Sequence, residues 1–317
     1  MGSYYEHTIT HDRELELLSN LKDFLPDLQI KKYRILSGGW NSNILLLNEE
    51  IVCRFPTTRY AKDKMLKEIE LQKHMDSYPV TVPQYEYFHE SEPMFGTYRY
   101  IEGVPLKNSK SRGRQMITDF SEVLQFNRAH SSEFNKLPYM DKYTPKEWQM
   151  KMEKLILSFQ NELGPTIQQE FFDNLRDAMY KCLDSLAPED MSFVHGDLSK
   201  DNVIISRNHR RVKGILDWAD SGIGDVALDL AAIVDDVEEL STPGICNILS
   251  KMVHDVPIKR VMMYRSISPL YYAFFISRAK GREMLEHIYK HHTSQKLKRR
   301  YEQFRLYQSY RQKRFKI

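Results

Sequence analysis

Apolar residues recur at helical spacing in two segments of the first hundred residues. A leucine every three or four positions predicts a helix over residues 12–25, and a methionine- and isoleucine-bearing face predicts another over residues 61–76. Between them, YRILSGGWNSNILLLNEEIVCRFP has the pattern of three strands, with a glycine turn and then a short turn at Asn48–Glu50. Two further strands are predicted over residues 84–89 and 95–101. This order predicts a small sheet that carries one main helix.

After Pro105, helical spacing prevails. Helices are predicted over residues 115–131, 146–162 and 167–186, and over most of the chain from residue 226 onward. Short strands are predicted among them near residues 192–194, 203–205 and 213–216. We therefore predict an α+β fold with two lobes. Residues 1–101 would form an N-lobe with a small antiparallel sheet and one main helix. Residues 102–317 would form a larger, mostly helical C-lobe, joined through a short hinge near residues 99–105.

The composition is that of an ordinary folded protein. Hydrophobic residues make up 41% and charged residues 28% of the chain, so a disordered protein is not indicated. No apolar stretch is long enough to cross a bilayer, and the N-terminus lacks the basic start and apolar run of a secretory signal. The three cysteines are scattered, without the spacing of a metal site. We expect them to be buried free thiols in a reducing cytoplasm: Cys53, Cys182 and Cys246.

Charge is distributed unevenly along the chain. Residues 296–317 contain nine Lys or Arg residues and one acid, Glu302, which is a charge of +8; the net +3 of the whole chain therefore leaves −5 for residues 1–295. Aromatic residues interleave with the basic ones in this tail, a pattern that can bind nucleic acid through phosphate contacts and stacking. The same aromatics also fit one face of a terminal helix packed on the C-lobe. We favour the helix, and do not expect a nucleic-acid partner.

Acidic and amide side chains gather in two stretches, FVHGDLSKDNVIIS and GILDWADSGIGD, each of which contains an apolar, β-like run. Phosphoryl transfer needs a carboxylate that orients and deprotonates the attacking hydroxyl, and oxygen ligands that hold Mg²⁺ against the β- and γ-phosphates. His195, Asp197 and Asn202, followed by Asp217, have the spacing that this chemistry uses. Any one of them alone is typical of a solvated turn. The joint pattern favours a catalytic site.

Two longer motifs are more specific than this spacing: HGDLSKDN and LDWADSGIGDVALDLAAIVDDVEEL. Four other stretches accompany them: LSGGWNSNILLL, VCRFP, LKEIELQK and YIEGVPL. Together they resemble the aminoglycoside phosphotransferase and choline kinase superfamily, whose fold is similar to that of the protein kinases. The resemblance spans residues 35–290 and is closest to the enzymes that phosphorylate the 2″ hydroxyl of aminoglycosides. It implies a small-molecule kinase that uses Mg²⁺ with ATP or GTP and acts as a monomer.

The resemblance also implies roles for single residues. Asp197 would be the catalytic base that orients the substrate hydroxyl. Asn202 and Asp217 would bind Mg²⁺. Glu68, on the helix of the N-lobe, would pair with a basic residue on the third strand, which is Arg54 in this chain.

Other residues are implied to hold the nucleotide or the fold. The loop Ser37–Ser42, which includes Gly38, would cover the phosphates, and the main chain of Arg99–Ile101 would bind the base. Asp225 and Asp229 would hold loops and helix ends together without taking part in the chemistry, and His195 would shape the catalytic loop through backbone hydrogen bonds.

The chain departs from the family pattern in two places. Arg54 stands where a lysine is expected, and the loop SGGWNSN is not G-x-G-x-x-G. Arginine keeps the charge and can bind phosphate with two nitrogens, but it is longer and planar. We favour a phosphate contact for Arg54 over an ion pair with Glu68 alone. The loop by itself is a weak signal.

The prediction of the phosphate acceptor rests on acidic residues in the predicted helical region after residue 226. In VDDVEEL, the positions of Asp235 and Glu238 match family acids that contact aminoglycoside amines, although a solvated acidic face is equally compatible with this run. An aminoglycoside is therefore the expected substrate. A choline-like, sugar or macrolide substrate is the alternative within the enzyme class, and a non-catalytic nucleotide- or RNA-binding protein on the same scaffold is the alternative outside it.

Overall fold

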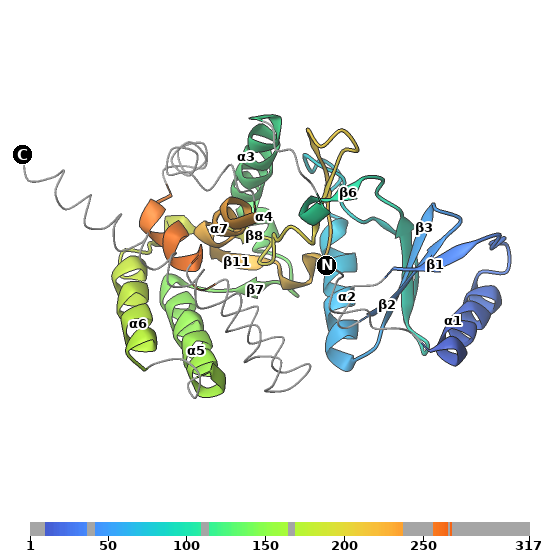
Figure 1. Cartoon of the computed structure of the whole chain (residues 1–317), viewed down its shortest axis with the longest axis horizontal. Coiled ribbons are helices and arrows are strands. Elements are labelled where there is room, and N and C mark those ends of the chain that lie inside the picture. Colours follow the sequence, from blue (N-terminus) through green and yellow to red (C-terminus); the bar gives the residue numbers. More distant parts are fainter. Residues whose placement is uncertain are drawn as a thin grey trace, which may run out of the picture.

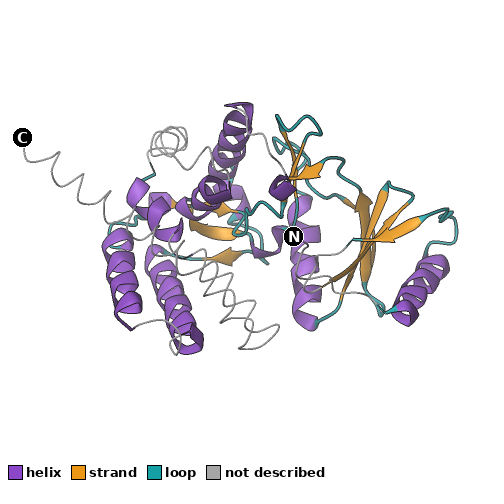
Figure 2. Ribbon diagram, viewed as in Figure 1, coloured by secondary structure: helices purple, strands orange, loops and turns teal. Residues whose placement is uncertain are grey.

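The computed structural model describes residues 10–36, 42–108, 114–163, 169–236, 256–265 and 267. A five-stranded sheet with two helices lies at one end of the molecule, and the other helices lie at the opposite end (Figure 1). Two small sheets lie between the helical end and helix α2 (Figure 2). The arrangement is the two-lobed, kinase-like α+β fold that the sequence predicts.

The five-stranded sheet is entirely antiparallel, in the order β1-β2-β3-β5-β4. Its strands are β1 (Tyr33–Ile35), β2 (Ser42–Leu47), β3 (Ile51–Pro56), β4 (Tyr85–His89) and β5 (Phe95–Arg99). The predicted turn at Asn48–Glu50 joins β2 to β3, with Asn48 and Glu49 at positive φ. The side chain of Asn48 accepts hydrogen bonds from the backbone N–H groups of Lys31 and Lys32 and thereby closes the turn.

Two helices accompany this sheet. Helix α1 (His11–Phe24) begins at Thr10 and α2 (Arg59–Gln72) begins at Thr58; in each case the threonine side chain accepts a hydrogen bond from the first turn. Helix α1 buries Leu17 and Leu21 in the core of the sheet, as its leucine pattern predicts. Helix α2 ends four residues before the predicted end at 76.

The second lobe is mostly helical, as predicted. Its helices are α3 (Arg114–Ala129), α4 (Ser131–Phe134), α5 (Pro145–Leu163), α6 (Gln169–Leu183) and α7 (Ala227–Asp236), and residues 258–265 are also helical. The rest of the helical region predicted after residue 236 lies outside the described residues, together with the basic tail 296–317.

Six short strands form two further sheets. The predicted strands are present as β8 (Met191–Val194), β9 (Val203–Ile205) and β10 (Val212–Ile215). They join strands that the sequence pattern did not reveal: β6 (Val104–Pro105), β7 (Asp141–Lys142) and β11 (Gly222–Asp225). The sheet orders are β10-β9-β6 and β7-β11-β8. Because β6 forms the end of the predicted hinge and already pairs with β9 of the C-lobe, we propose the boundary between the lobes at residues 101–102.

The larger hydrophobic core crosses between the lobes. It contains most buried apolar residues of the second lobe, and it also contains Leu71, Met75, Tyr78 and Val82 from the end of α2 and the segment that follows. In that segment, the N–H of Thr81 donates to Lys213 O (3.0 Å), and its carbonyl accepts from Ile215 N (3.0 Å). The connection between α2 and β4 is therefore part of the C-lobe packing.

Two predictions from composition can be compared with the structure. Cys53 and Cys182 are buried free thiols, as expected, whereas Cys246 lies outside the described residues. Within the described part of the chain, no helix combines the length and apolar character needed to cross a membrane.

Candidate active site

The loop between β8 and β9 is organised around His195, which is fully buried. Its Nδ1 accepts from the backbone N–H of Asp197 (3.2 Å), so Nε2 is the protonated nitrogen and donates to Leu216 O (2.9 Å). Burial lowers the pKa of the imidazole, which keeps this neutral tautomer. Asp229 of α7 accepts from His195 N (2.6 Å) and Gly196 N (3.0 Å). His195 and Asp229 thus shape the loop, as predicted.

Gly196 allows this loop to approach the segment after β10. Its φ is +84°, and a Cβ atom built on it would lie 2.4 Å from the carbonyl oxygen of Asp220. Only glycine satisfies both the left-handed backbone and this close contact. The two acidic motifs are therefore packed directly against each other.

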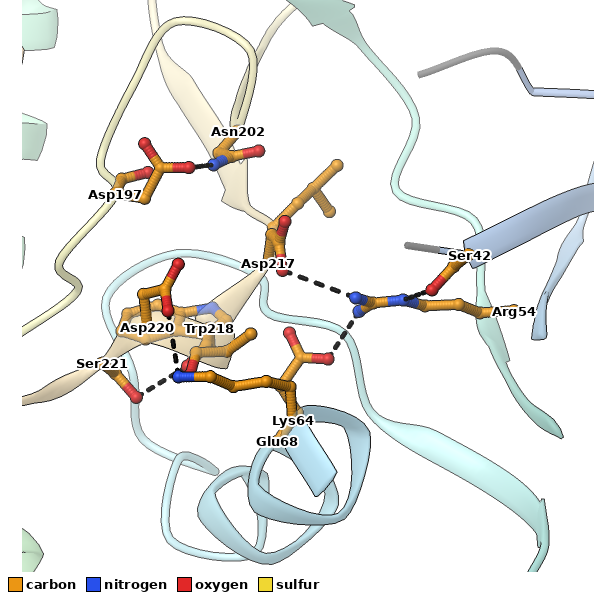
Figure 3. Close-up of polar contacts among 12 residues, drawn as sticks. Ser42, Arg54, Lys64, Glu68, Asp197, Asn202, Asp217, Trp218, Asp220 and Ser221 are labelled. Carbon is orange, nitrogen blue, oxygen red and sulfur yellow. Dashed lines mark hydrogen bonds and ion pairs between the residues drawn. The ribbon is translucent and has the colours of Figure 1, made fainter. Parts of the chain in front are cut away.

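Asp197 and Asn202 are joined within this loop. The Nδ2 of Asn202 donates to both the backbone oxygen and Oδ2 of Asp197, at 2.9 Å each (Figure 3). Residue 197 is open to solvent at one side. Desolvation by the surrounding protein, with the charges of Asp217 and Asp220, raises the pKa of the Asp197 carboxyl to about 7. A carboxyl poised in this way can exchange a proton with a hydroxyl near neutral pH.

Asp217 follows β10 and is brought beside Asn202 by the backbone. The N–H of Leu216 donates to Asn202 O (2.8 Å), and Asp217 takes a left-handed conformation with φ of 60°. The next residue, Trp218, is buried against the rings of His195 and Phe193 and donates to Ile215 O (3.1 Å). This packing anchors the turn, and the Asp217 carboxylate remains partly exposed within reach of Arg54.

The donor chemistry of this pair suits Mg²⁺. Because the Nδ2 of Asn202 is hydrogen-bonded to Asp197, the amide oxygen of Asn202 can coordinate a metal ion, and Asp217 offers carboxylate oxygens. Hard oxygen ligands are those that Mg²⁺ prefers, and it usually completes its octahedron with water and phosphate. Within the described ranges, no group of three or more His, Cys, Asp or Glu side chains converges on one point. Asn202 and Asp217 would therefore hold the ion jointly with a nucleotide.

Arg54 of β3 faces this site from the other lobe. Its guanidinium contacts Glu68 Oε2 (2.5 Å), Ser42 Oγ (3.2 Å) and Asp217 Oδ1 (3.5 Å) (Figure 3). Burial opposes the charge on Arg54, but the carboxylates of Glu68 and Asp217, together with nearby tyrosines, raise the pKa of the guanidinium well above its usual value. Glu68 is therefore paired with the basic residue of the third strand, and the same cation reaches toward the candidate metal site.

The remaining predicted residues differ in what the structure shows of them. The backbone N–H of Tyr100 donates to Glu50 O (2.7 Å), which holds the segment Arg99–Ile101 against the sheet. Ser42 is the first residue of β2, whereas Ser37 and Gly38 lie outside the described residues. Two further candidates belong to the acidic run. The backbone of Asp235 lies in the last turn of α7, and neither its side chain nor Glu238 is described.

A set of contacts between the lobes was not foreseen. Lys64 and Lys67 of α2 bond to the segment that follows Asp217, and Lys67 also pairs with Asp141 of β7 (2.9 Å). Lys67 is buried beside Glu68. The residues of this set are 74 to 156 positions apart in the chain, and a lysine on an amphipathic helix is ordinarily solvated. Nothing in the sequence pattern distinguished these two.

A positioned carboxyl group, two side chains whose oxygens suit a metal and a largely buried cation opposite them are the parts expected of a kinase-like phosphotransferase. Residues 32–245 match the model of the phosphotransferase enzyme family known as APH. The chain belongs to this family and is a phosphotransferase.

Solved structures with the same fold include enzymes with different acceptors. A mutant of aminoglycoside 2′-phosphotransferase-IIIa in complex with GDP is 18% identical, with a TM-score of 0.73, over 91% of this chain and 97% of that one. A ternary complex of streptomycin, ATP and APH(2″)-IIa is 19% identical, with a TM-score of 0.60, over 88% and 94%. A macrolide 2′-phosphotransferase type I is 17% identical, with a TM-score of 0.62, over 88% and 96%. This likeness establishes the fold.

Proposed function

We propose that this protein transfers the γ-phosphate of ATP or GTP to a hydroxyl group of an aminoglycoside. The observation that carries the proposal is the convergence of Asp197, Asn202 and Asp217 with the Arg54–Glu68 pair where the two lobes meet. Membership of the phosphotransferase family supports it. Among the structural matches, bound GDP and bound ATP both occur, which leaves both nucleotides as candidate donors.

In this mechanism, Asp197 accepts a hydrogen bond from the acceptor hydroxyl and takes its proton as the oxygen attacks the γ-phosphorus. The bond from that phosphorus to the bridging oxygen of the β-phosphate breaks, and the nucleoside diphosphate leaves. Bound Mg²⁺ would neutralise the charge on the phosphates. Asn202 and Asp217 would hold that ion, while Arg54, oriented by Glu68, would contact the phosphates directly.

The nucleotide base would bind to the main chain of Arg99–Ile101, where the sheet ends, and the loop Ser37–Ser42 would cover the phosphates. We further propose that the enzyme is cytoplasmic, because Cys53 and Cys182 are unpaired thiols, as is usual in a reducing compartment. We propose a monomer from the resemblance to its family alone.

The choice of an aminoglycoside rests on charge. A polyamine is attracted by the net −5 of residues 1–295 and by the acids of the run that contains Asp235 and Glu238. Macrolides are the second candidate, because a macrolide 2′-phosphotransferase shares the fold.

A panel assay tests the proposal. Purified protein with Mg²⁺ and either ATP or GTP should phosphorylate at least one aminoglycoside, with turnover in the range of about 1–100 s⁻¹ that is typical of kinases. The same panel should contain macrolides, choline and simple sugars. Turnover of a macrolide alone would replace the aminoglycoside as acceptor. Nucleotide binding without turnover of any compound would agree with a kinase-like nucleotide-binding protein and would contradict the proposed reaction.

The acidic run provides a separate prediction. The double substitution Asp235→Asn and Glu238→Gln should raise KM for an aminoglycoside by about a hundredfold or more, because each lost charge-assisted hydrogen bond is worth about 1.5–3 kcal/mol and about 1.4 kcal/mol corresponds to tenfold. KM for the nucleotide should not change and serves as the internal control. An unchanged KM for the aminoglycoside would show that these acids do not bind its amines.

A further inference from the structure

Helix α2 bonds directly to the turn that carries Asp217. Lys67 Nζ donates to Ser221 O (2.5 Å) and to Asp141 Oδ2 (2.9 Å), while Lys64 Nζ donates to Ala219 O (2.9 Å) and Asp220 Oδ1 (3.0 Å). Figure 3 shows the side chain of Lys64, which extends below Trp218 toward Asp220, on the side of the turn opposite to Asn202. The turn is thus held by the catalytic loop on one side and by α2 on the other.

Lys67 has the more restrictive surroundings of the two lysines. Its side chain is 7% exposed, compared with 18% for Lys64. Ser221, whose carbonyl it binds, is fully buried and closes the turn itself, since Ser221 N and Oγ both donate to Trp218 O (3.1 and 2.7 Å). A buried ammonium group is stable only when its N–H groups are hydrogen-bonded. Displacement of this turn would therefore remove the hydrogen bond of Lys67 to the carbonyl of Ser221.

The position of Lys67 beside Glu68 connects two halves of the site. The same turn of α2 directs Glu68 to Arg54 and Lys67 to the backbone after Asp217. Toward its C-terminus, α2 continues into the C-lobe core through Leu71, and the chain then pairs with β10 through Thr81. Helix α2 is therefore attached to the C-lobe at its middle and at its C-terminal end, and the ion pair of Glu68 with Arg54 is a link from this unit to the sheet.

We propose, on the basis of the function proposed above, that Lys67 is a positioning residue. It fixes the position of the turn 217–221 relative to α2. Asp217 therefore keeps a constant position relative to the Arg54–Glu68 pair, as binding of Mg²⁺ and nucleotide requires. Asp141 assists by holding the ammonium from β7. Neither lysine touches a reacting atom in this arrangement; the effect passes through the backbone of Ser221.

The test measures nucleotide binding without any acceptor. A non-hydrolysable analogue of ATP or GTP, whichever binds the wild type, is titrated into the protein by calorimetry with and without Mg²⁺. Lys67→Met should reduce the Mg²⁺-dependent gain in affinity by about tenfold or more, as loss of a residue that orients metal ligands does, and should leave the Mg²⁺-free affinity unchanged. Asp141→Asn should give a smaller loss in the same direction. Amide hydrogen exchange of residues 217–222 should accelerate in both variants.

Lys62→Met is the matched control, because Lys62 lies on the same helix but pairs with Glu92 away from the turn. Its effect on the Mg²⁺-dependent affinity should stay within about twofold, as for other surface changes. Methionine fills much of the volume of Lys67, and Asp141, at 50% exposure, can be solvated without its partner, so the variant should fold.

A Lys67→Met protein with lower Tm but unaltered Mg²⁺-dependent affinity and unaltered exchange at residues 217–222 would overturn the proposal. Its failure is separable from failure of the proposed function. If the wild type turns over no acceptor but binds nucleotide, the binding experiment still decides the role of Lys67. If it binds no nucleotide, the positioning role for Mg²⁺ and nucleotide is overturned, and hydrogen exchange then reports only whether Lys67 restrains residues 217–222.

Discussion

Replacing Asp197 with asparagine is expected to lower kcat by about 10²–10⁴-fold, the usual contribution of a positioned general base. The substitution keeps the shape of the side chain and an oxygen that can accept from Asn202, so the loop should retain its conformation. What is lost is the capacity to take the hydroxyl proton. The measurement is steady-state turnover of the best acceptor, with the dissociation constant of the nucleotide determined in parallel and expected to stay within about threefold.

Asp201→Asn is the matched control for this experiment. Asp201 lies in the same loop and loses the same charge, but its carboxylate pairs with Lys107 (2.7 Å) at the surface. Its kcat should remain within about threefold of the wild type, since exposed ion pairs contribute little. If the Asp197 variant folds and keeps more than a tenth of the wild-type kcat, Asp197 is not the base.

The substitution Asp217→Asn is expected to have the second-largest effect. The variant loses a charged ligand of the proposed metal, and kcat should fall by about 10²–10³-fold, because charge neutralisation by such an ion is worth several kcal/mol. The concentration of Mg²⁺ that gives half-maximal rate should rise as well. The measurement is turnover across a Mg²⁺ titration, with a chelator-treated sample as the zero point.

The Asp217 experiment also distinguishes metal binding from a role in folding. Trp218 anchors the turn independently of the carboxylate, so Tm should fall little. The Mg²⁺ titration of Asp201→Asn should coincide with that of the wild type. An Asp217 variant with a reduced rate but an unshifted Mg²⁺ midpoint would assign Asp217 to structure and leave the ion with other ligands.

Local pattern was sufficient for the longer elements of this fold. The leucine spacing of α1 and the turn at Asn48–Glu50 both have local physical causes, namely one buried helical face and an asparagine, a residue type enriched at positive φ. The end of α2 was predicted too late. Met75 continues the apolar spacing past residue 72 because it packs in the C-lobe core, and burial of that kind resembles a helical face in the sequence.

The candidate site was predicted for a similar reason. His195, Asp197 and Asn202 lie within eight residues of sequence, so their spacing alone places them in one loop. The ion pair between Arg54 and Glu68 was expected from the resemblance and is present, with Asp217 as a third contact. The role proposed for Asp235 and Glu238 rests on the sequence, because the structure does not describe their side chains.

By itself, the sequence determined the order of the longer elements, the two-lobed architecture and the chemical character of the catalytic loop, because each depends on residues close together in the chain. Only the tertiary structure revealed the strand β7, which has two residues, and the strand β11, whose sequence GIGD has one apolar side chain and so carries no pattern. It alone decided that Lys67 is buried on Ser221, 154 residues away. Such contacts depend on how the lobes pack, and a lysine in a helix has the same local preferences whether that packing buries it or leaves it in water.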